Sequence, residues 1–484
     1  MPKQSRITGA MALLIAQAVV LMLGYVTHLW IGRFLGPGPY GIYGVVLSLQ
    51  TILGILLTLG VPSAVSRFVA QDEVHAESIL RQALKIQTLL AFGLSAIVAI
   101  FSPGIAFLLN DPTLTPLIAF VAAVLFLQAF YPIYVQYFSG LHRFNRQALL
   151  TIIYAIAKLA GAVALLYAFD VFGAFSGFAI GGVIAAMLGW YWTRATRNKK
   201  TTAKLPLKEF LSFAGMYVLI LAGLQLLMSI DLFMVKSLLR DDVQAGYYNA
   251  AVTLSRISYF LLQGLSFIVL PSVSKLTKPG ASQTQAVSFI SRMLRYLIAL
   301  IIPSITLAAA TSEQLVILFF SSSFVPGAPA LTVLMLGVGI LSFYLLLANI
   351  AAGANKAKTA LGITILMIIV SLIAGFILIP RYQLVGAAWQ TTIAAFVGLI
   401  ALTIYIFSTF RIPYPVKSTI NIVIATAAAV LPTYVWEVSP FLLPLQYVVL
   451  LGLYIVVLWI LGEVKPSDRA LLASIHPRLS FLKK

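Results

Sequence analysis

The chain of 484 residues contains no cysteine and few acidic residues. Without cysteine it forms no disulfide, no thiolate metal site and no thiol nucleophile. Only 13 Asp and Glu and four His are spread along it, and they form neither a catalytic carboxylate pair nor a metal-ligand spacing. A P-loop is also missing. The sequence therefore predicts no enzyme activity, no cofactor and no metal site.

Charged residues are scarce as well: they make up 9% of the chain, against 61% hydrophobic residues. Runs of about 20 apolar residues recur from end to end, and each is long enough to cross a bilayer core of about 30 Å as a helix. We predict an all-α integral membrane protein with 14 transmembrane helices, at 8–31, 41–66, 84–109, 115–138, 147–169, 172–193, 210–238, 246–270, 287–310, 328–352, 359–379, 384–408, 418–436 and 440–462.

The positive charge indicates the topology. If the N-terminus is cytoplasmic, four of the 32 Lys and Arg residues fall on the outer side, Arg33, Lys236, Arg240 and Arg381. Lys158 and Arg256 fall inside spans, and the remainder lie on the cytoplasmic side. This asymmetry predicts a multi-pass protein of the cytoplasmic (inner) membrane with both termini in the cytoplasm. The net charge of +19 is then a topology signal, and nucleic acid is not an expected partner.

The sequence contains an internal repeat. Residues 41–44 correspond to 246–249, and residues 140–143 and 173–175 correspond to 353–356 and 386–388, both at an offset of 213. We expect an N-terminal six-helix lobe (1–200), a C-terminal six-helix lobe (201–410), two additional helices (411–463) and a basic cytoplasmic tail (464–484). An even number of spans makes the lobes parallel, related by an axis along the membrane normal, which is typical of transporters.

One string carries a family resemblance. Residues 31–43, IGRFLGPGPYGIY, resemble the hairpin between the first two helices of polysaccharide-type (Wzx-like) flippases in the multidrug/oligosaccharidyl-lipid/polysaccharide exporter superfamily. Residues 231–236 and 246–250 resemble the matching hairpin of the second lobe. The resemblance implies a V-shaped fold of six, six and two helices, and flipping or export of lipid-linked oligosaccharide or polysaccharide precursors. It leaves the particular glycan open.

Polar residues in two equivalent spans predict a substrate cleft. Four of them share one face of the span 246–270, namely Asn249, Thr253, Arg256 and Gln263. The aligned positions of the span 41–66 are also small or polar and include Ser48 and Thr51. We expect these two stripes to form opposite walls of one mildly cationic central cavity, with the lipid-linked glycan between them.

The ionisable residues near or inside the spans allow two interpretations each. Arg256 is suited to the pyrophosphate or an acidic sugar of the cargo, or it forms a structural pair with Asp231. Arg33 and Lys236, at aligned positions near the outer mouth, either hold a departing diphosphate or extend to lipid headgroups. Lys158 faces the lobe interior or the cleft. Asp231 is a candidate for H⁺ or Na⁺ coupling.

Two other functions compete with glycan export. A cation-coupled multidrug exporter of the same superfamily would favour acidic residues in the cleft, whereas the spans hold Lys158 and Arg256 against Asp231 alone. A peptidoglycan-precursor flippase is a close variant of the first interpretation. The expected partners are the lipid-linked glycan and the membrane lipids, with glycan polymerases or glycosyltransferases as further candidates.

Overall fold

The computed structural model describes residues 6–194, 207–276, 283–354, 356–410, 416–436 and 438–463. Regular structure in these ranges is helical throughout, without a strand. Its contacts divide the chain into two compact units, Met1–Ala250 and Ala251–Lys484. The predicted linker within 195–206 and the tail at 464–484 lie outside the described residues.

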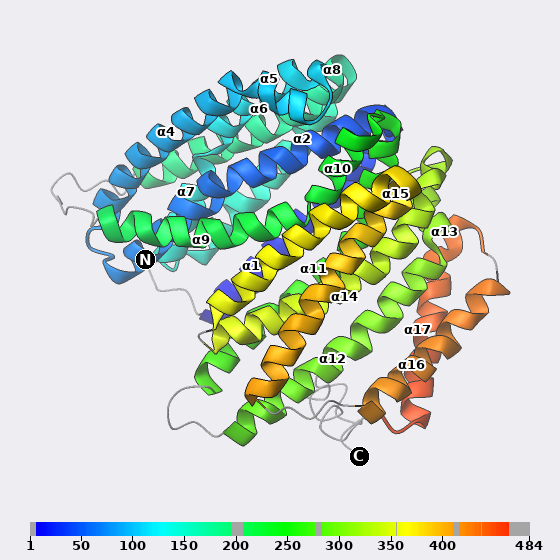
Figure 1. The fold of residues 1–484 in the computed structure, drawn as a ribbon. Coiled ribbons are helices and arrows are strands. Elements are labelled where there is room, and N and C mark those ends of the chain that lie inside the picture. Colours follow the sequence, from blue (N-terminus) through cyan, green and yellow to red (C-terminus); the bar gives the residue numbers. More distant parts are fainter. Residues whose placement is uncertain are drawn as a thin grey trace. The chain divides into compact units, whose positions relative to one another are not determined.

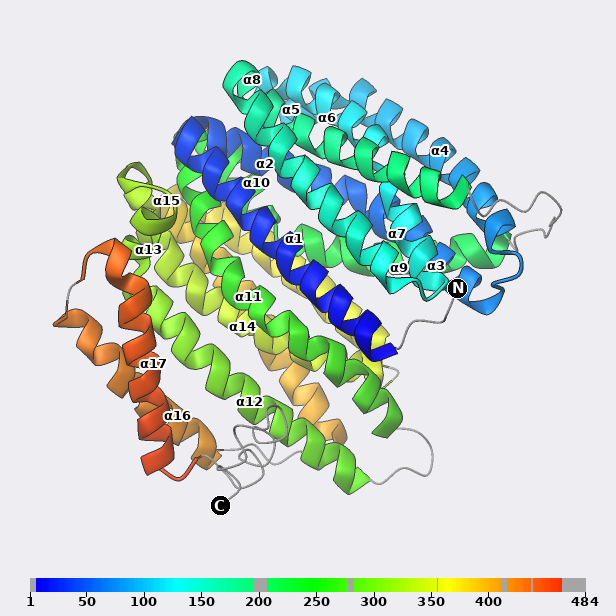
Figure 2. The same cartoon turned by 180° about the vertical axis from the view of Figure 1, so that it is seen from behind.

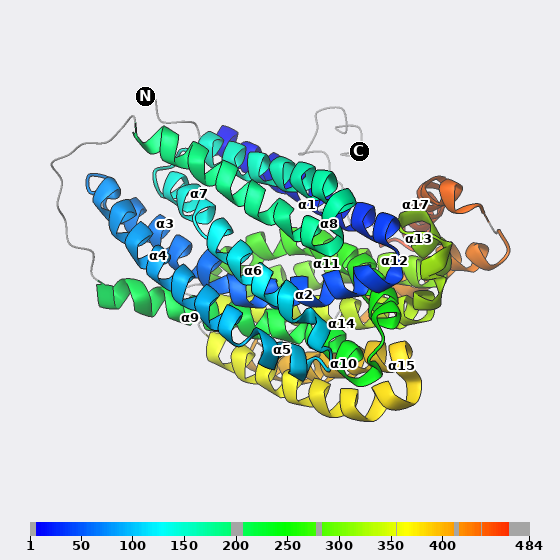
Figure 3. The same cartoon turned by 90° about the horizontal axis from the view of Figure 1, so that it is seen from above.

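The first unit is a bundle of helices that begins with α1 and ends inside α11 (Figure 1). Within it α1 and α7 pack on α8, α3 packs on α7, and α9 lies along the segment from α2 to α3 (Figure 3). The helices are α1 (Arg6–Leu35), α2 (Pro37–Ile55), α3 (Val61–Gln71), α4 (Ala76–Ile100), α5 (Ser102–Leu108), α6 (Thr115–Gln128), α7 (Tyr131–Gly140), α8 (Phe144–Arg194), α9 (Leu207–Leu227), α10 (Ile230–Leu239) and α11 (Asp242–Leu276).

The second unit contains the rest of α11 and six further helices. Helix α15 packs along α14, and α16 and α17 form a pair on α12 (Figure 2). The Tyr454 hydroxyl on α17 donates a hydrogen bond to the Ala299 carbonyl on α12, at 2.7 Å. The helices are α12 (Gln283–Ala310), α13 (Ser312–Phe319), α14 (Ala328–Gly353), α15 (Ala357–Phe410), α16 (Val416–Val430) and α17 (Leu443–Ile460).

The helices account for the predicted membrane spans. Ten segments of the described residues are long and apolar enough to cross a membrane, and the bent pair α9–α10 makes eleven. Two of the ten, in α8 and α15, are 51 and 52 residues long, whereas about 20 residues cross a bilayer core. Each reverses at one residue and supplies two crossings. With α11, which has 35 residues, the predicted fourteen-helix fold is confirmed.

The reversals inside α8 and α15 are equivalent. They occur at Asp170 (φ 46°, ψ −127°) and Gln383 (φ 48°, ψ −125°), which are 213 residues apart. The two breaks predicted between 169 and 172 and between 379 and 384 are therefore confirmed. Next to each reversal a glycine lets the arms touch, because a Cβ would lie 2.1 Å from the Leu165 carbonyl oxygen at Gly173 and 2.2 Å from a carbonyl oxygen at the equivalent Gly386.

The turns that precede these hairpins also match. The Arg143 amide donates to the Phe138 carbonyl at 2.8 Å, and the Lys356 amide donates to the Ala351 carbonyl at 2.8 Å. Both members of this pair of bonds are again 213 residues apart. Repetition of the same hydrogen bond and the same backbone reversal at one offset supports the duplication inferred from the sequence.

A break in the path from α2 to α3 is stabilised by a buried glutamine. Residues Leu56–Gly60 form a single π-helical turn, which leaves backbone carbonyls without their usual helical donors. The Gln87 amide nitrogen on α4 donates to the carbonyls of Leu57 and Ala129, each at 2.7 Å. Ala129 lies at the break between α6 and α7, so one fully buried side chain satisfies two interrupted helices at once.

Helices α2 and α11, the equivalent members of the repeat, cross at equivalent glycines. A Cβ at Gly41 would lie 2.1 Å from the Asp242 carbonyl oxygen, and a Cβ at Gly246 would lie 1.8 Å from the Pro37 carbonyl oxygen. Each glycine therefore meets the first helical residue of the other helix. Only residues without a side chain permit this backbone-to-backbone approach.

Replacement of Gly246 by Ala should destabilise the first unit. The added methyl group has to displace the backbone of Pro37, so we expect a loss of about 1–3 kcal/mol or more in the free energy of unfolding. Thermal unfolding of the purified protein in detergent measures this effect.

Gly93→Ala is the matched control, because Gly93 is also helical but nothing lies within 4 Å of its Cβ position. That variant should be neutral or stabilised by up to about 1 kcal/mol. Equal melting temperatures for Gly246→Ala and Gly93→Ala would contradict the close crossing of α2 and α11.

Candidate functional site

The predicted polar face of α11 is described from Asn249 to Arg256. Asn249 and Thr253 are buried, and Arg256 is half-buried. The side chain of Gln263 lies outside the described side chains. The residues predicted on α2 differ among themselves, since Ser48 is buried and Thr51 is exposed.

Asn249 joins the two equivalent helices. Its amide nitrogen donates to the Tyr40 carbonyl at 3.2 Å, and its side chain fills the space beside Gly44, where a Cβ would lie 2.2 Å from the amide. Gly44 and Asn249 are the aligned pair of the repeat, so one helix supplies the gap and the other fills it. The amide therefore contributes to the crossing of α2 and α11, and its contact with cargo stays a prediction.

The hydroxyl of Thr51 is bonded within its own helix. Its oxygen donates to the Leu47 carbonyl at 2.8 Å, the usual arrangement of threonine in a helix. The exposed Thr51 side chain retains acceptor capacity on its oxygen. A role for Ser48 and Thr51 in cargo binding stays a prediction.

Asp231 is buried in the first turn of α10. One carboxylate oxygen accepts from the Tyr248 hydroxyl at 2.8 Å, and the other accepts from the Leu232 amide at 2.8 Å. Tyr248, which is fully buried on α11, was not predicted as a functional residue, although it stands in the repeated string 246–249. The carboxylate is thus solvated by protein donors, as a charge inside a low-dielectric region requires.

Lys236 is the buried member of an ionic cluster whose two carboxylates are half-buried. The ammonium lies 2.5 Å from a carboxylate oxygen of Asp111 and also contacts the Asp242 carboxylate, and Lys236 is 2% exposed. Nearby, the Asn110 amide donates to the Ser237 carbonyl at 2.9 Å. We call these contacts the loop latch, because they hold the loop before α6 against the end of α10 and the start of α11. Arg33, its aligned counterpart on α1, is exposed instead.

The latch was not foreseen in the sequence because its members are distant in the chain. Asp111 was available as a signal, since Asp-Pro-Thr is a typical start of a helical turn. In the structure Asp111 accepts from the Thr113 amide at 3.0 Å, as such a cap does. Partial burial would raise the pKa of the Asp111 carboxyl, but the hydrogen bonds from Lys236 and Thr113 outweigh it and hold that pKa below its ordinary value.

Lys158 lies on the first arm of the α8 hairpin, and its ammonium stands 4.9 Å from the centroid of the Phe178 ring on the second arm. Among the described residues no carboxylate lies within ion-pair distance of it. Gly177 beside it allows the arms to touch, since a Cβ there would lie 2.4 Å from the Lys158 carbonyl oxygen. At the equivalent positions of α15 the Gln390 amide donates to the Ser371 hydroxyl at 2.9 Å.

These features define a class of protein. The chain has many apolar helices, an internal repeat whose two copies reverse at equivalent residues, and cationic residues inside spans. Together these features are typical of a polytopic membrane transporter. The sequence profile of the family described as polysaccharide biosynthesis protein matches residues 7–277. The match spans more than half of the chain, and the chain belongs to this family.

Relatives and solved structures agree with this assignment. The membrane protein MJ1068 of Methanocaldococcus jannaschii is 21% identical over 423 residues, which cover 82% of both chains. The structure of the lipid II flippase MurJ in an inward closed conformation matches with a TM-score of 0.75 at 15% identity, over 94% of this chain and 99% of that chain. An inward-facing multidrug resistance transporter of the MATE family matches with a TM-score of 0.64 at 17% identity, over 82% and 98%. At these identities the structures establish the shared fold.

Replacement of Lys236 by Met should destabilise the protein by about 1–3 kcal/mol at neutral pH, because the half-buried carboxylate of Asp111 then loses its cationic partner. A carboxyl group with a lowered pKa stabilises the folded state above its ordinary pKa and loses that contribution as the pH falls through the folded pKa. The difference from the wild type should therefore shrink below about pH 4. Chemical unfolding in detergent from pH 7 to pH 3 measures it.

Arg33→Met is the control for this series, since it removes an exposed cation at the aligned position. We expect a change within about 0.5 kcal/mol at every pH. A destabilisation of Lys236→Met that is as small as that of Arg33→Met at neutral pH would show that the latch contributes nothing to folding.

Proposed function

We propose that this protein flips lipid-linked oligosaccharide or polysaccharide precursors across the cytoplasmic membrane, with both termini in the cytoplasm. The observation that carries the proposal is the sign of the charge at membrane depth. Lys158 and Arg256 stand in spans of a chain that belongs to the polysaccharide biosynthesis family, while Asp231 is already bonded to Tyr248 and Leu232. A diphosphate linked to a sugar is the cargo that such a balance favours.

Arg256 has the leading role in this proposal. A guanidinium presents five donors in a planar fork, which matches phosphate oxygens in pairs. It follows Asn249 by two helical turns and Thr253 by one, on the same side of α11. The neighbouring polar groups would then bind sugar hydroxyls while Arg256 binds the diphosphate, and the lipid tail stays in the bilayer.

Alternating access supplies the mechanism. The repeat gives two parallel six-helix lobes, and rocking of such lobes exposes a central site to one side of the membrane at a time. In the predicted topology the loop latch lies at the outer side, because Asn110 and Arg240 stand in outer loops. Closure of the latch would seal that side, and its opening would release the glycan. Glycan polymerases or glycosyltransferases at the membrane are the expected partners.

The solved structures with this fold include a lipid II flippase and a multidrug transporter, so peptidoglycan-precursor flipping and drug export are the two alternatives. A multidrug exporter needs a site that attracts cationic drugs. The engaged carboxylate of Asp231 and the two cationic side chains disfavour it. The lipid II alternative keeps the same diphosphate chemistry and differs in the sugar and peptide.

Replacement of Arg256 by Gln should reduce flipping at least tenfold, because charge-assisted hydrogen bonds contribute about 1.5–3 kcal/mol each. The assay uses proteoliposomes loaded with an undecaprenyl-diphosphate-linked oligosaccharide and measures how fast the sugar becomes accessible to an impermeant glycosidase. Arg256→Lys keeps the charge without the fork and should be intermediate. Lys275→Gln, an exposed change near the end of the same helix, should have no effect.

The same assay separates the alternatives. Ethidium uptake that exceeds glycan flipping would favour drug export, and flipping of lipid II in preference to the oligosaccharide would favour the peptidoglycan precursor. Full glycan flipping by Arg256→Gln would contradict the role proposed for this residue.

Crosslinking of the loop latch should stop transport. Because the wild-type chain has no cysteine, the pair Asn110→Cys and Ser237→Cys can be introduced alone and joined with a short bifunctional thiol reagent. If the outer side must open, the crosslinked protein should flip less than a tenth of the glycan of the untreated protein. Each single-cysteine variant serves as a control for the reagent. Undiminished flipping after complete crosslinking would contradict opening at this loop.

A further inference from the structure

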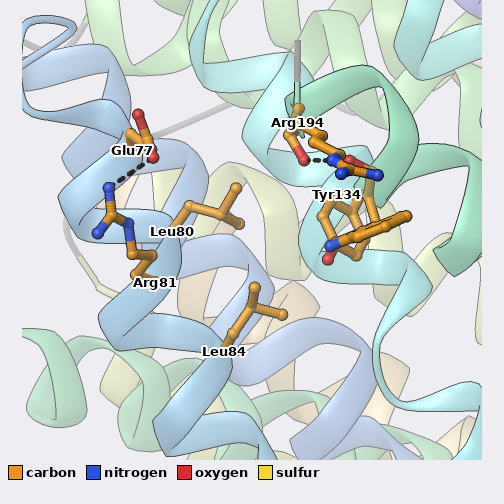
Figure 4. A pocket seen from close by; sticks show the side chains of 8 residues that line it. Glu77, Leu80, Arg81, Leu84, Tyr134 and Arg194 are labelled. Atoms are coloured by element: carbon orange, nitrogen blue, oxygen red, sulfur yellow. Dashed lines mark hydrogen bonds and ion pairs between the residues drawn. The ribbon is translucent and has the colours of Figure 1, made fainter. Parts of the chain in front are cut away.

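A pocket at one end of the first unit lies between two helical walls (Figure 4). The first wall is the start of α4, with Glu77, Arg81 and Leu84, and the second wall brings Tyr134 from α7 together with the last turn of α8, including Arg194. Figure 4 shows Arg81 and Arg194 on opposite walls. The other lining residues are Leu80, Trp190 and Thr193.

The two walls meet because of the hairpin in α8. Since α8 reverses at Asp170, its last turn returns to the end of the unit where α4 begins and α7 ends. Tyr134 packs directly on Gly189, where a Cβ would lie 2.5 Å from the ring. This contact fixes the last turn of α8, and with it Arg194, beside the start of α4.

The pocket carries net positive charge. Its ionisable residues are Arg81, Arg194 and Glu77. The Glu77 carboxylate lies 2.6 Å from one guanidinium nitrogen of Arg81, which leaves the other donors of that guanidinium for a ligand. The guanidinium of Arg194 stands 5.4 Å from the centroid of the Trp190 ring, and the described part of the chain places no carboxylate within ion-pair distance of it.

The surroundings of the pocket are apolar and face outward. Trp190 is 47% exposed, and Met187, nearly one turn further from the end of α8, is 64% exposed. On α4, Leu89 and Phe92 are 73% and 65% exposed. Apolar helix faces of this kind are covered by acyl chains in a membrane protein, and tryptophan at the boundary is typical of the headgroup level. A basic pocket directly beside such faces matches a ligand with an anionic head and two apolar tails.

We propose that this pocket binds the phosphate headgroup of an anionic membrane phospholipid, with Arg81 and Arg194 as its two ligands. The guanidinium groups pair with the phosphate oxygens from opposite walls, and the glycerol lies near Trp190. The acyl chains then follow the exposed faces of α4 and α8. This site is distinct from the polar face of α11, and the proposal does not depend on which cargo the protein moves.

The test uses the full chain in phosphatidylcholine vesicles that contain an increasing fraction of phosphatidylglycerol with brominated acyl chains. Bromine quenches a nearby indole, and the signal of Trp190 is obtained by subtraction of the variant Trp190→Phe. We expect quenching of Trp190 to saturate at a low fraction of brominated phosphatidylglycerol, and to need a fraction at least tenfold higher when brominated phosphatidylcholine replaces it.

The variant Arg81→Gln/Arg194→Gln should raise the required fraction of phosphatidylglycerol about tenfold. Arg67→Gln/Lys85→Gln is the control, because it also removes two cationic charges, on α3 and α4, but neither residue lines the pocket. It should change the required fraction of phosphatidylglycerol by less than about twofold. If the first double variant does not fold, Arg194→Gln alone, at the exposed end of α8, gives the same comparison.

Equal quenching by both brominated lipids, or an equal effect of both double variants, would overturn the proposal and indicate a general attraction of the basic end to anionic surfaces. Displacement of brominated phosphatidylglycerol by inorganic phosphate at millimolar concentration would also overturn it, because a soluble anion would then suffice as the ligand.

Discussion

The contact between the backbones of α2 and α11 is the constraint on which the first unit depends. At Gly41 and Gly246 the helices approach until a single methyl group would collide with a carbonyl oxygen. Dispersion forces fall steeply with distance, so this approach replaces bulky side chains as the source of packing energy in a lipid environment. The crossing also determines which side chains meet around it. Asn249 fits against Gly44 because the crossing lies one helical turn away, and Tyr248, on the same turn of α11, reaches Asp231.

The buried polar groups follow from a second physical rule. A donor or acceptor without a partner costs several kcal/mol in hydrocarbon, so each interruption of a helix must be satisfied from within the protein. Gln87 bonds the carbonyls at two breaks, and Lys236 balances the carboxylates around it. These side chains make the irregular segments possible, and irregular segments are where a membrane protein can change its shape.

Much of the fold could be predicted from the sequence, because the bilayer imposes one length and one polarity on every span. The breaks at Asp170 and Gln383 were expected at the right places for this reason. The latch was not, since Asp111 and Lys236 are 125 residues apart and no local pattern connects them. Asn249 was expected in a cleft, yet its amide donates a hydrogen bond to the Tyr40 carbonyl. Spacing along a helix identifies which residues share a face, but it does not identify what packs on that face. The cargo contacts of the other predicted residues stay predictions.

The α8 and α15 hairpins have the same backbone and different contents. In α8 the ammonium of Lys158 lies over the ring of Phe178. In α15 the equivalents of Lys158 and Gly177, which are Ser371 and Gln390, form a neutral hydrogen bond instead. The two halves thus share one backbone arrangement, while the residues that join the two arms differ. An exchange of the two hairpins would therefore preserve the course of the backbone and transfer a cationic side chain from the first half of the repeat to the second.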